Sequence, residues 1–207
     1  AAPWQCRRFP LSRGAMQVCR LTAHDLACRR GDRLLFRGLA LDLANGAALQ
    51  VKGANGTGKS SLIRILAGLM APFAGRVERN GAMALLDERP ALDPALPLAK
   101  ALAFWQRLDG PAENHAAQLG LLPLAEVPVR YLSTGQKKRA GLARMAGQGA
   151  PIWLLDEPLN GLDRRGVALV EDLVAQHCAA GGIALVASHQ PIALPGGAAI
   201  DLADFAA

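Results

Sequence analysis

The sequence predicts an α/β fold that combines a parallel sheet with an antiparallel β layer and an inserted helical subdomain. Two apolar runs, at 152–155 and 183–187, flank a stretch with helical periodicity at 167–178. This is the pattern of a βαβ unit whose two strands are parallel and buried. Between 90 and 149 the strand signals vanish, and prolines punctuate short helices rich in alanine and leucine. A chain of 207 residues is long enough for one domain with such an insertion.

The first part of the chain indicates a β layer that leads into the core. Residues 18–23 alternate like an edge strand, Asn45 and Gly46 are typical turn residues, and 47–51 is expected to be the strand that follows. Further segments have strand character: 34–36, 39–43, 75–78 and 82–86. The last stretch, 195–207, carries no interpretable pattern.

A phosphate-binding pattern, G-x-x-x-x-G-K-[ST], is matched at every fixed position by Gly53, Ala54, Asn55, Gly56, Thr57, Gly58, Lys59 and Ser60. Its glycines let the backbone curl, so that successive N–H groups point at a polyphosphate. Lys59 supplies a positive charge for the β- and γ-phosphates, and the Ser60 hydroxyl can bind Mg²⁺. Helical spacing predicts a helix over 61–67 with Gly68 at its end, and its positive end would face the phosphates.

Two carboxylates follow the buried strand at 152–155. Asp156 can hold Mg²⁺ through water, and Glu157 is placed to polarise a water molecule as a general base. His189 follows the strand at 183–187, at the edge where parallel α/β folds bind ligands. Each feature alone is also explained by a loop opening or an incidental histidine. Their combination with the phosphate loop favours a catalytic site.

The stretch at 132–139 predicts a helix with a capped N-terminus. Ser133 is a good N-cap, and Gly135 and Gln136 begin a helix that continues to about 146. Such an end offers free N–H groups and a partial positive charge to an anion.

In their order and spacing these motifs resemble those of the ATP-binding cassette (ABC) ATPases, over roughly residues 18–191. The phosphate loop is similar to the Walker A motif of that family, 152–157 to Walker B, and 159–163 to the D-loop. Residues 132–136 resemble the signature sequence, with Thr134 in place of the first glycine, and His189 resembles the switch histidine.

The resemblance implies an ATPase with ATP and Mg²⁺ as cofactors and an integral membrane subunit as partner. It implies a second copy in a head-to-tail dimer, in which Ser133, Gly135 and Gln136 cover the nucleotide of the facing chain. Ser61 joins the phosphate loop in binding ATP, and Glu157 and His189 are the catalytic residues.

A narrower resemblance is to the ATPase subunits of cytochrome c maturation complexes. It is carried by 151–159, by 187–191, by Phe104 and Trp105, and by the short chain without a regulatory domain. It implies haem or a haem chaperone as an indirect partner, and a peripheral location at the cytoplasmic face of the cell membrane.

Two positions depart from the family pattern. The family's glutamine after the third core strand is missing, and Glu88 in that neighbourhood is expected to replace it as a Mg²⁺ ligand. Arg30 stands where an adenine-stacking aromatic residue is usual. Its guanidinium plane can stack on adenine instead, with less apolar area buried.

Composition limits the remaining possibilities. The net charge of +6 has a local origin in Arg7, Arg8, Arg13, Arg20, Arg29, Arg30, Arg33 and Arg37. Nucleic acid or anionic lipid could contact such a patch, but no aromatic residues interleave with it as a stacking platform would require. We interpret it as a solvated face and expect no nucleic-acid partner. Cys6, Cys19, Cys28 and Cys178 form no C-x-x-C pair, which fits a reducing compartment without a metal or disulfide framework.

We therefore expect a single ABC ATPase domain over 16–207, after a possible extension at 1–15. Its α/β core would comprise 16–89 and 150–207, and its helical subdomain 90–149. No apolar run is long enough to span a membrane, and the N-terminus lacks a secretory signal. Three alternatives are an ATPase of another small-cargo exporter, a soluble ABC-type ATPase acting on nucleic acid or ribosomes, and a P-loop kinase. The lack of heptad runs and of a second cassette disfavours the soluble ATPase, and the helix start at Ser133 disfavours the kinase.

Overall fold

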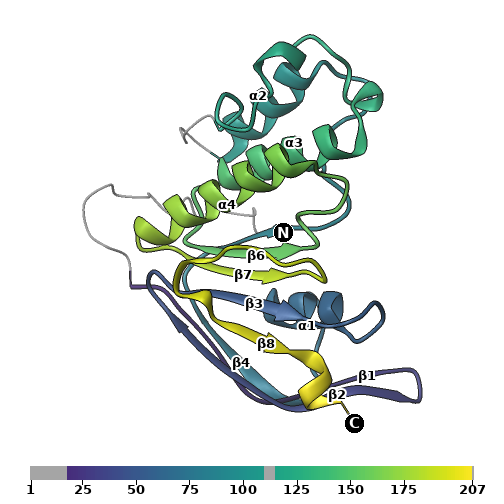
Figure 1. The fold of residues 1–207 in the computed structure, drawn as a ribbon, viewed down its shortest axis with the longest axis vertical. Helices are drawn as coiled ribbons and strands as arrows, with labels where there is room; N and C mark the ends of the chain where they lie inside the picture. The colour runs from purple at the N-terminus through teal and green to yellow at the C-terminus, as the bar shows by residue number, and fades with distance from the viewer. Residues whose placement is uncertain (1–17, 110–114, 207) are drawn as a thin grey trace, which may run out of the picture.

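The computed structural model describes residues 18–109 and 115–206, which fold around two sheets. The antiparallel sheet has the strand order β2-β1-β4, and the parallel sheet has the order β5-β6-β7-β3-β8. Figure 1 shows the antiparallel sheet below the parallel one and helices α2 and α3 above it. The expected α/β architecture with an antiparallel layer is therefore confirmed. The possible extension at 1–15 and Cys6 lie outside the described residues.

The antiparallel sheet consists of β1 (Arg20–Arg30), β2 (Arg33–Ala44) and β4 (Ala74–Asn80). The prediction of an edge strand at 18–23 is wrong, because β1 pairs with β2 on one side and with β4 on the other. The partner β4 lies far along the chain, so local alternation gave no sign of it.

The strand segments expected at 34–36 and 39–43 belong to one continuous strand, β2. Gly38 lies between them with a φ of 71°. A glycine adopts this left-handed conformation at little cost, so the strand bends there without ending.

The parallel sheet consists of β5 (Met83–Leu86), β6 (Ile152–Asp156), β7 (Ile183–Ala187), β3 (Ala48–Lys52) and β8 (Ala199–Asp201). Helix α4 (Arg164–Ala179) connects β6 to its parallel neighbour β7, which confirms the predicted βαβ unit. Strand β8 was not foreseen. It adds an edge strand beside β3, in a segment whose sequence has no alternating pattern.

Alternate residues of the parallel sheet enter two separate cores. In β6, Ile152 and Leu154 pack with α1 (Lys59–Leu66) and the antiparallel sheet, whereas Trp153 and Leu155 pack with helices on the opposite face. This period of two is the alternation expected of a strand buried on both faces. The sheet is thus a middle layer, and its ends can position loops between the two cores.

The described part of the region 90–149 consists of helices, turns and loops, and its only β pairing is one isolated bridge. It contains α2 (Leu98–Asp109), α3 (Thr134–Ala146) and two 3₁₀ turns at Leu122–Leu124 and Val129–Tyr131. The division of the chain at 90 and 150 stays a prediction. Within 18–109 and 115–206, no helix has the length and apolar character needed to cross a membrane.

Part of the basic surface is paired within the chain. Arg20 forms an ion pair with Asp42, and the Arg29 guanidinium lies 4.5 Å from the centroid of the Phe73 ring. The three described cysteines, at 19, 28 and 178, are buried and unbridged.

Candidate nucleotide-binding and catalytic site

The phosphate loop connects β3 to α1 and has the backbone that its glycines predict. Gly53, Gly56 and Gly58 have φ values of 146°, 82° and 109°, a region that L side chains rarely adopt. At Gly58 a Cβ atom would lie only 3.2 Å from Phe36 and 3.3 Å from Leu35. Glycine is needed at this position both for its conformation and because β2 packs against it.

Lys59, the first residue of α1, directs its ammonium back into the loop. The side chain is 6% exposed, and Nζ donates hydrogen bonds to the carbonyl oxygens of Gly53 at 2.9 Å and Ala54 at 3.2 Å. It also forms an ion pair with Glu157 Oε1 at 3.2 Å. The carbonyl oxygens of the loop and the Glu157 carboxylate therefore hold the cation at the loop.

Glu157 makes a second contact, with His189. Its Oε2 lies 2.9 Å from His189 Nδ1, so one carboxylate contacts both Lys59 and His189. The φ of Glu157 is 47°, a conformation that costs a non-glycine residue on the order of 1–3 kcal/mol. This backbone turn after β6 lets consecutive carboxylates, Asp156 and Glu157, both reach the site. The structure therefore brings Lys59, Glu157 and His189 together.

The loop that carries His189 is fixed by buried polar groups that the sequence did not single out. Ser188 is fully buried; its Oγ donates to the Gln190 carbonyl at 3.0 Å and accepts from the Gln190 N–H at 3.0 Å. The same carbonyl accepts a 2.8 Å hydrogen bond from Nε2 of Gln50 on β3. These bonds position His189 next to Glu157, although 41% of the His189 side chain is exposed.

Asp156 has the properties of an oxygen ligand for a cation. It is 6% exposed, and its Oδ1 is buried without a hydrogen-bond partner among the described residues. Burial raises the pKa of this carboxyl, whereas a hydrogen bond from Ser60 lowers it. A carboxylate and a hydroxyl side by side suit a hard cation such as Mg²⁺.

No three His, Cys, Asp or Glu side chains converge on a possible metal position within 18–109 and 115–206. A cation at Asp156 and Ser60 would therefore take its other ligands from phosphate or water. Glu88 lies in the loop after β5 and is exposed. Its predicted role as a third ligand stays a prediction.

The predicted signature residues are in a different environment. Ser133 Oγ accepts from Gln136 N–H at 3.2 Å, and Gln136 Oε1 accepts from Ser133 N–H at 2.8 Å, which forms a capping box at the start of α3. Gly135 packs so closely on the Gly161 carbonyl that a Cβ atom would lie 2.5 Å from it. In the described chain, no hydrogen bond or ion pair connects these residues to Lys59 or Glu157. Arg30 ends β1 and is exposed.

Two contacts near the site escaped the sequence interpretation. Leu202, in the C-terminal 3₁₀ turn Leu202–Phe205, is buried beside the phosphate loop, 3.5 Å from the Cβ position of Gly53. Lys138 on α3 faces the carboxylates that follow β5 and β6. Leu202 belongs to no contiguous motif, and Lys138 lies in the stretch 132–139 without an assigned role, so only the folded chain shows their position.

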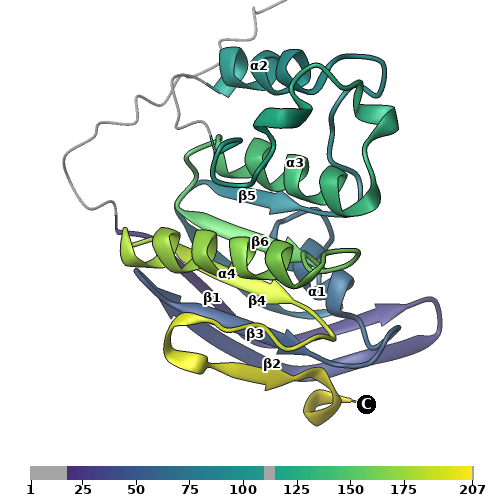
Figure 2. The same ribbon diagram turned by 45° about the horizontal axis from the view of Figure 1, so that its top comes forward.

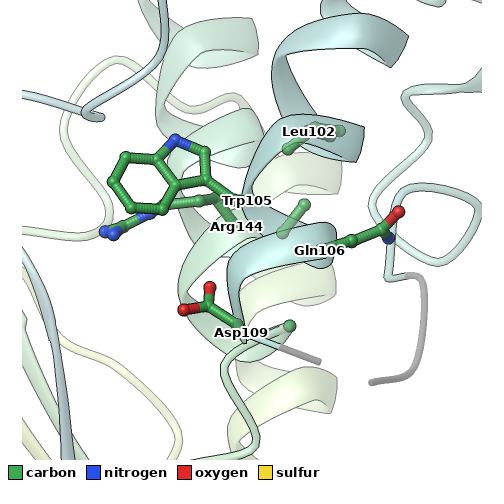
Figure 3. A pocket seen from close by; sticks show the side chains of 7 residues that line it. Leu102, Trp105, Gln106, Asp109 and Arg144 are labelled. Carbon is green, nitrogen blue, oxygen red and sulfur yellow. The ribbon is translucent and has the colours of Figure 1, made fainter. Parts of the chain in front are cut away.

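A small pocket between α2 and α3 lies apart from these residues (Figure 3). It is lined by Leu102, Trp105, Gln106, Asp109, Ala143, Arg144 and Gly147. The Arg144 guanidinium lies 4.0 Å from the centroid of a Trp105 ring, and Trp105 Nε1 donates a 2.7 Å hydrogen bond to the Ala91 carbonyl. Trp105 therefore ties α2 to the loop that contains Glu88.

Comparison with known proteins identifies the family of the chain. The family model described as ABC transporter matches residues 36–160, which is more than half of the chain. The fold, the phosphate loop and this match define an ABC-type ATPase, a protein that binds and hydrolyses ATP.

Two relatives show which group of ABC-type ATPases the chain resembles. The chain is 62% identical over 179 residues to the cytochrome c biogenesis ATP-binding export protein CcmA of Novosphingobium aromaticivorans, covering 86% of this chain and 93% of that protein. It is 52% identical over 180 residues to CcmA of Sphingopyxis alaskensis, covering 84% and 92%. The chain belongs to the CcmA family. Both resemblances inferred from the sequence are thereby confirmed.

A solved structure from Pyrococcus furiosus, described as an ABC transporter ATP-binding protein, has the same fold. It superposes with a TM-score of 0.79 at 20% identity and covers 91% of this chain and 100% of that one. At this identity the similarity concerns the fold alone.

Proposed function

We propose that this chain is the ATP-hydrolysing subunit of a membrane complex that matures c-type cytochromes, with haem or a haem chaperone as its indirect partner. The names of its relatives, cytochrome c biogenesis ATP-binding export proteins, support this proposal. The chain would lie at the cytoplasmic face of the cell membrane and bind an integral membrane subunit.

The contact of Glu157 with both Lys59 and His189 carries the catalytic proposal. When ATP enters, its β- and γ-phosphates would replace Glu157 as the partner of Lys59. The released carboxylate would then accept a proton from the attacking water, while His189 keeps it oriented. The water oxygen bonds to the γ-phosphorus, the bond to the β-phosphate oxygen breaks, and ADP leaves with that electron pair.

Ser60 and Asp156, with Glu88 as a further candidate, would hold Mg²⁺ beside the phosphates. The cation would supply positive charge that offsets the phosphate oxygens. The buried and unpartnered Oδ1 of Asp156 supports this assignment. Ser61 would join the phosphate loop, and Arg30 would stack on the adenine.

Ser133, Gly135 and Gln136 would bind the nucleotide of a second copy. The capping box uses Ser133 Oγ as an acceptor, so its hydroxyl proton stays available to a phosphate. As the N-terminus of a 13-residue helix, this end also carries a partial positive charge. A head-to-tail dimer would bring it to the γ-phosphate of the facing chain. The predicted helical subdomain at 90–149 and the Glu88 loop would pass the resulting movement to the membrane subunit.

A strain that carries Lys59→Ala as its only copy tests the proposal. We expect c-type cytochromes to be lost while b-type cytochromes persist, because haem synthesis does not depend on this chain. Arg76→Ala, which changes an exposed arginine of β4 outside the helical subdomain, should leave both types unchanged. Normal c-type cytochromes in the Lys59→Ala strain would contradict the assigned role.

A further inference from the structure

One face of α3 places Lys138 at the end of the parallel sheet. A Cβ atom on Gly141 would lie 3.0 Å from Pro90 Cβ and 3.1 Å from Leu86 Cδ1, so this face packs on β5 and on the loop after it. Lys138 lies one helical turn before Gly141, on the same face. Its side chain therefore points toward the loop that follows β5.

The end of β6 lies at the same edge. Leu86, the last residue of β5, pairs with Leu155 in the parallel register, and Asp156 follows at once. The loop after β5 and the end of β6 are thus neighbours. The carboxylates of these two segments therefore lie on the side of α3 that carries Lys138.

The surroundings of Lys138 are acidic, but no carboxylate bonds to it. Burial lowers the pKa of its ammonium, and four carboxylates oppose this effect, in decreasing order Asp156, Glu88, Asp87 and Glu157. Among the described residues, none forms an ion pair or hydrogen bond with Lys138. Asp156, the strongest of the four, is itself nine-tenths buried with Oδ1 unpartnered.

The neighbouring Lys137 shows that this placement is specific. Its Nζ donates a 3.1 Å hydrogen bond to the Arg130 carbonyl before α3. The two adjacent lysines therefore leave the helix in different directions, and only Lys138 faces the carboxylates.

We propose that Lys138 is a positioning residue that acts as the resident counter-ion of Asp156 and Glu88 and makes divalent-cation binding depend on nucleotide. A divalent cation at Asp156 would be repelled by the ammonium, because both carry positive charge in a partly buried environment. The phosphates of ATP bring the negative charge that offsets this repulsion. The chain would accordingly take up the cation with the nucleotide rather than before it. This inference rests on the metal role proposed for Asp156.

Mn²⁺ binding to the nucleotide-free full chain, followed by electron paramagnetic resonance, tests the inference. Mn²⁺ prefers the same oxygen ligands as Mg²⁺ and is directly detectable. We expect Lys138→Met to bind Mn²⁺ roughly tenfold more tightly than the parent, the scale of one removed unit charge at this range. Lys138→Arg, which keeps the charge, and Lys137→Met should both match the parent. A gain in affinity is not a result that structural damage produces.

Asp156→Asn separates the two proposals. If it weakens Mn²⁺ binding while Lys138→Met equals the parent, the metal site stands and the role of Lys138 is wrong. If Asp156→Asn leaves Mn²⁺ binding unchanged, the metal role of Asp156 fails and the inference fails with it. Lys138→Gln replaces Lys138→Met in the same comparison if circular dichroism shows that the methionine variant does not fold.

Discussion

The polar groups at the carboxyl edge of the parallel sheet bond to distant residues, whereas those at the N-terminus of α3 bond to near neighbours in the sequence. At the sheet edge, Lys59, Glu157 and His189 come from three separate elements and bond to one another. At α3, the side chains of Ser133 and Gln136 each accept a hydrogen bond from the other residue's backbone N–H. The first region is held by long-range contacts, and the second by a local motif that forms whenever the helix forms.

In the proposed head-to-tail dimer, this difference would decide which half of the site each chain supplies. At the sheet edge, the Lys59 ammonium, the Glu157 carboxylate and the His189 ring are already in contact within one chain. The N-terminus of α3 is polar and capped. Among the described residues, no hydrogen bond or ion pair connects Ser133 or Gln136 to Lys59 or Glu157. Figure 2 shows α3 above strand β5, and α1 lower down, beside β6 and β3.

Glu157→Gln probes the sheet edge and should have the largest effect. An amide cannot accept the proton of the attacking water, so we expect turnover to fall roughly a hundredfold or more while ATP is still bound. Steady-state hydrolysis and nucleotide binding measured side by side would show this. Glu126→Gln, an exposed carboxylate in the region between α2 and α3, serves as the control. Turnover equal to that of the parent would remove Glu157 from its role.

Asp156→Asn tests how the buried charge at the sheet edge affects the stability of the folded chain. Burial raises the pKa of Asp156, so the folded chain disfavours its charged form. Below the ordinary carboxyl pKa both states are protonated and the variant should equal the parent. As pH rises through the raised pKa, the parent alone loses stability. The melting temperature of the variant without metal should therefore exceed that of the parent near neutral pH, by about 2–4 °C for each kcal/mol.

The control for this measurement is Asp172→Asn, which changes an exposed carboxylate on α4. Its melting temperature should follow the parent at every pH. A difference between Asp156→Asn and the parent that stays constant from acid to neutral pH would contradict the assigned cause.

Trp105→Phe tests the bond that connects the helical region to the sheet edge, with a smaller effect. The variant keeps an aromatic ring beside Arg144 and loses the hydrogen bond to Ala91. We expect a melting temperature lower by roughly 2–4 °C, the scale of one hydrogen bond in a domain of this size. Hydrogen exchange at Arg89 and Ala91 should quicken. Phe104→Leu, at a half-exposed neighbour, should change neither, and unchanged exchange in Trp105→Phe would disprove the link.

Contiguous motifs accounted for most of what the sequence predicted correctly. The phosphate loop and the βαβ unit follow from glycine spacing and from apolar runs, which local sequence encodes. Ser133 was identified as an N-cap for the same reason, because a capping box involves only neighbouring residues. The placement of Glu157 followed from its position at the end of a strand.

Features that depend on distant partners were missed or misjudged. Strand β1 is central because β4 pairs with it, and no local pattern shows that pairing. Leu202 reaches the phosphate loop only because β8 docks beside β3. Lys138 and Lys137 are adjacent in sequence but lie on different faces of α3. Only the packing of α3 on β5 decides which of the two lysines faces the carboxylates.

The oligomeric state of Glu157→Gln with saturating Mg·ATP tests the central claim that α3 completes the site of a second copy. Sedimentation should show a dimer, because the trapped nucleotide connects Lys59 of one chain to the Ser133 helix of the other. Adding Ser133→Arg should return the protein to a monomer, since the bulky cation would clash near the facing Lys59. A monomer before that change, or a dimer that survives it, would contradict the head-to-tail arrangement.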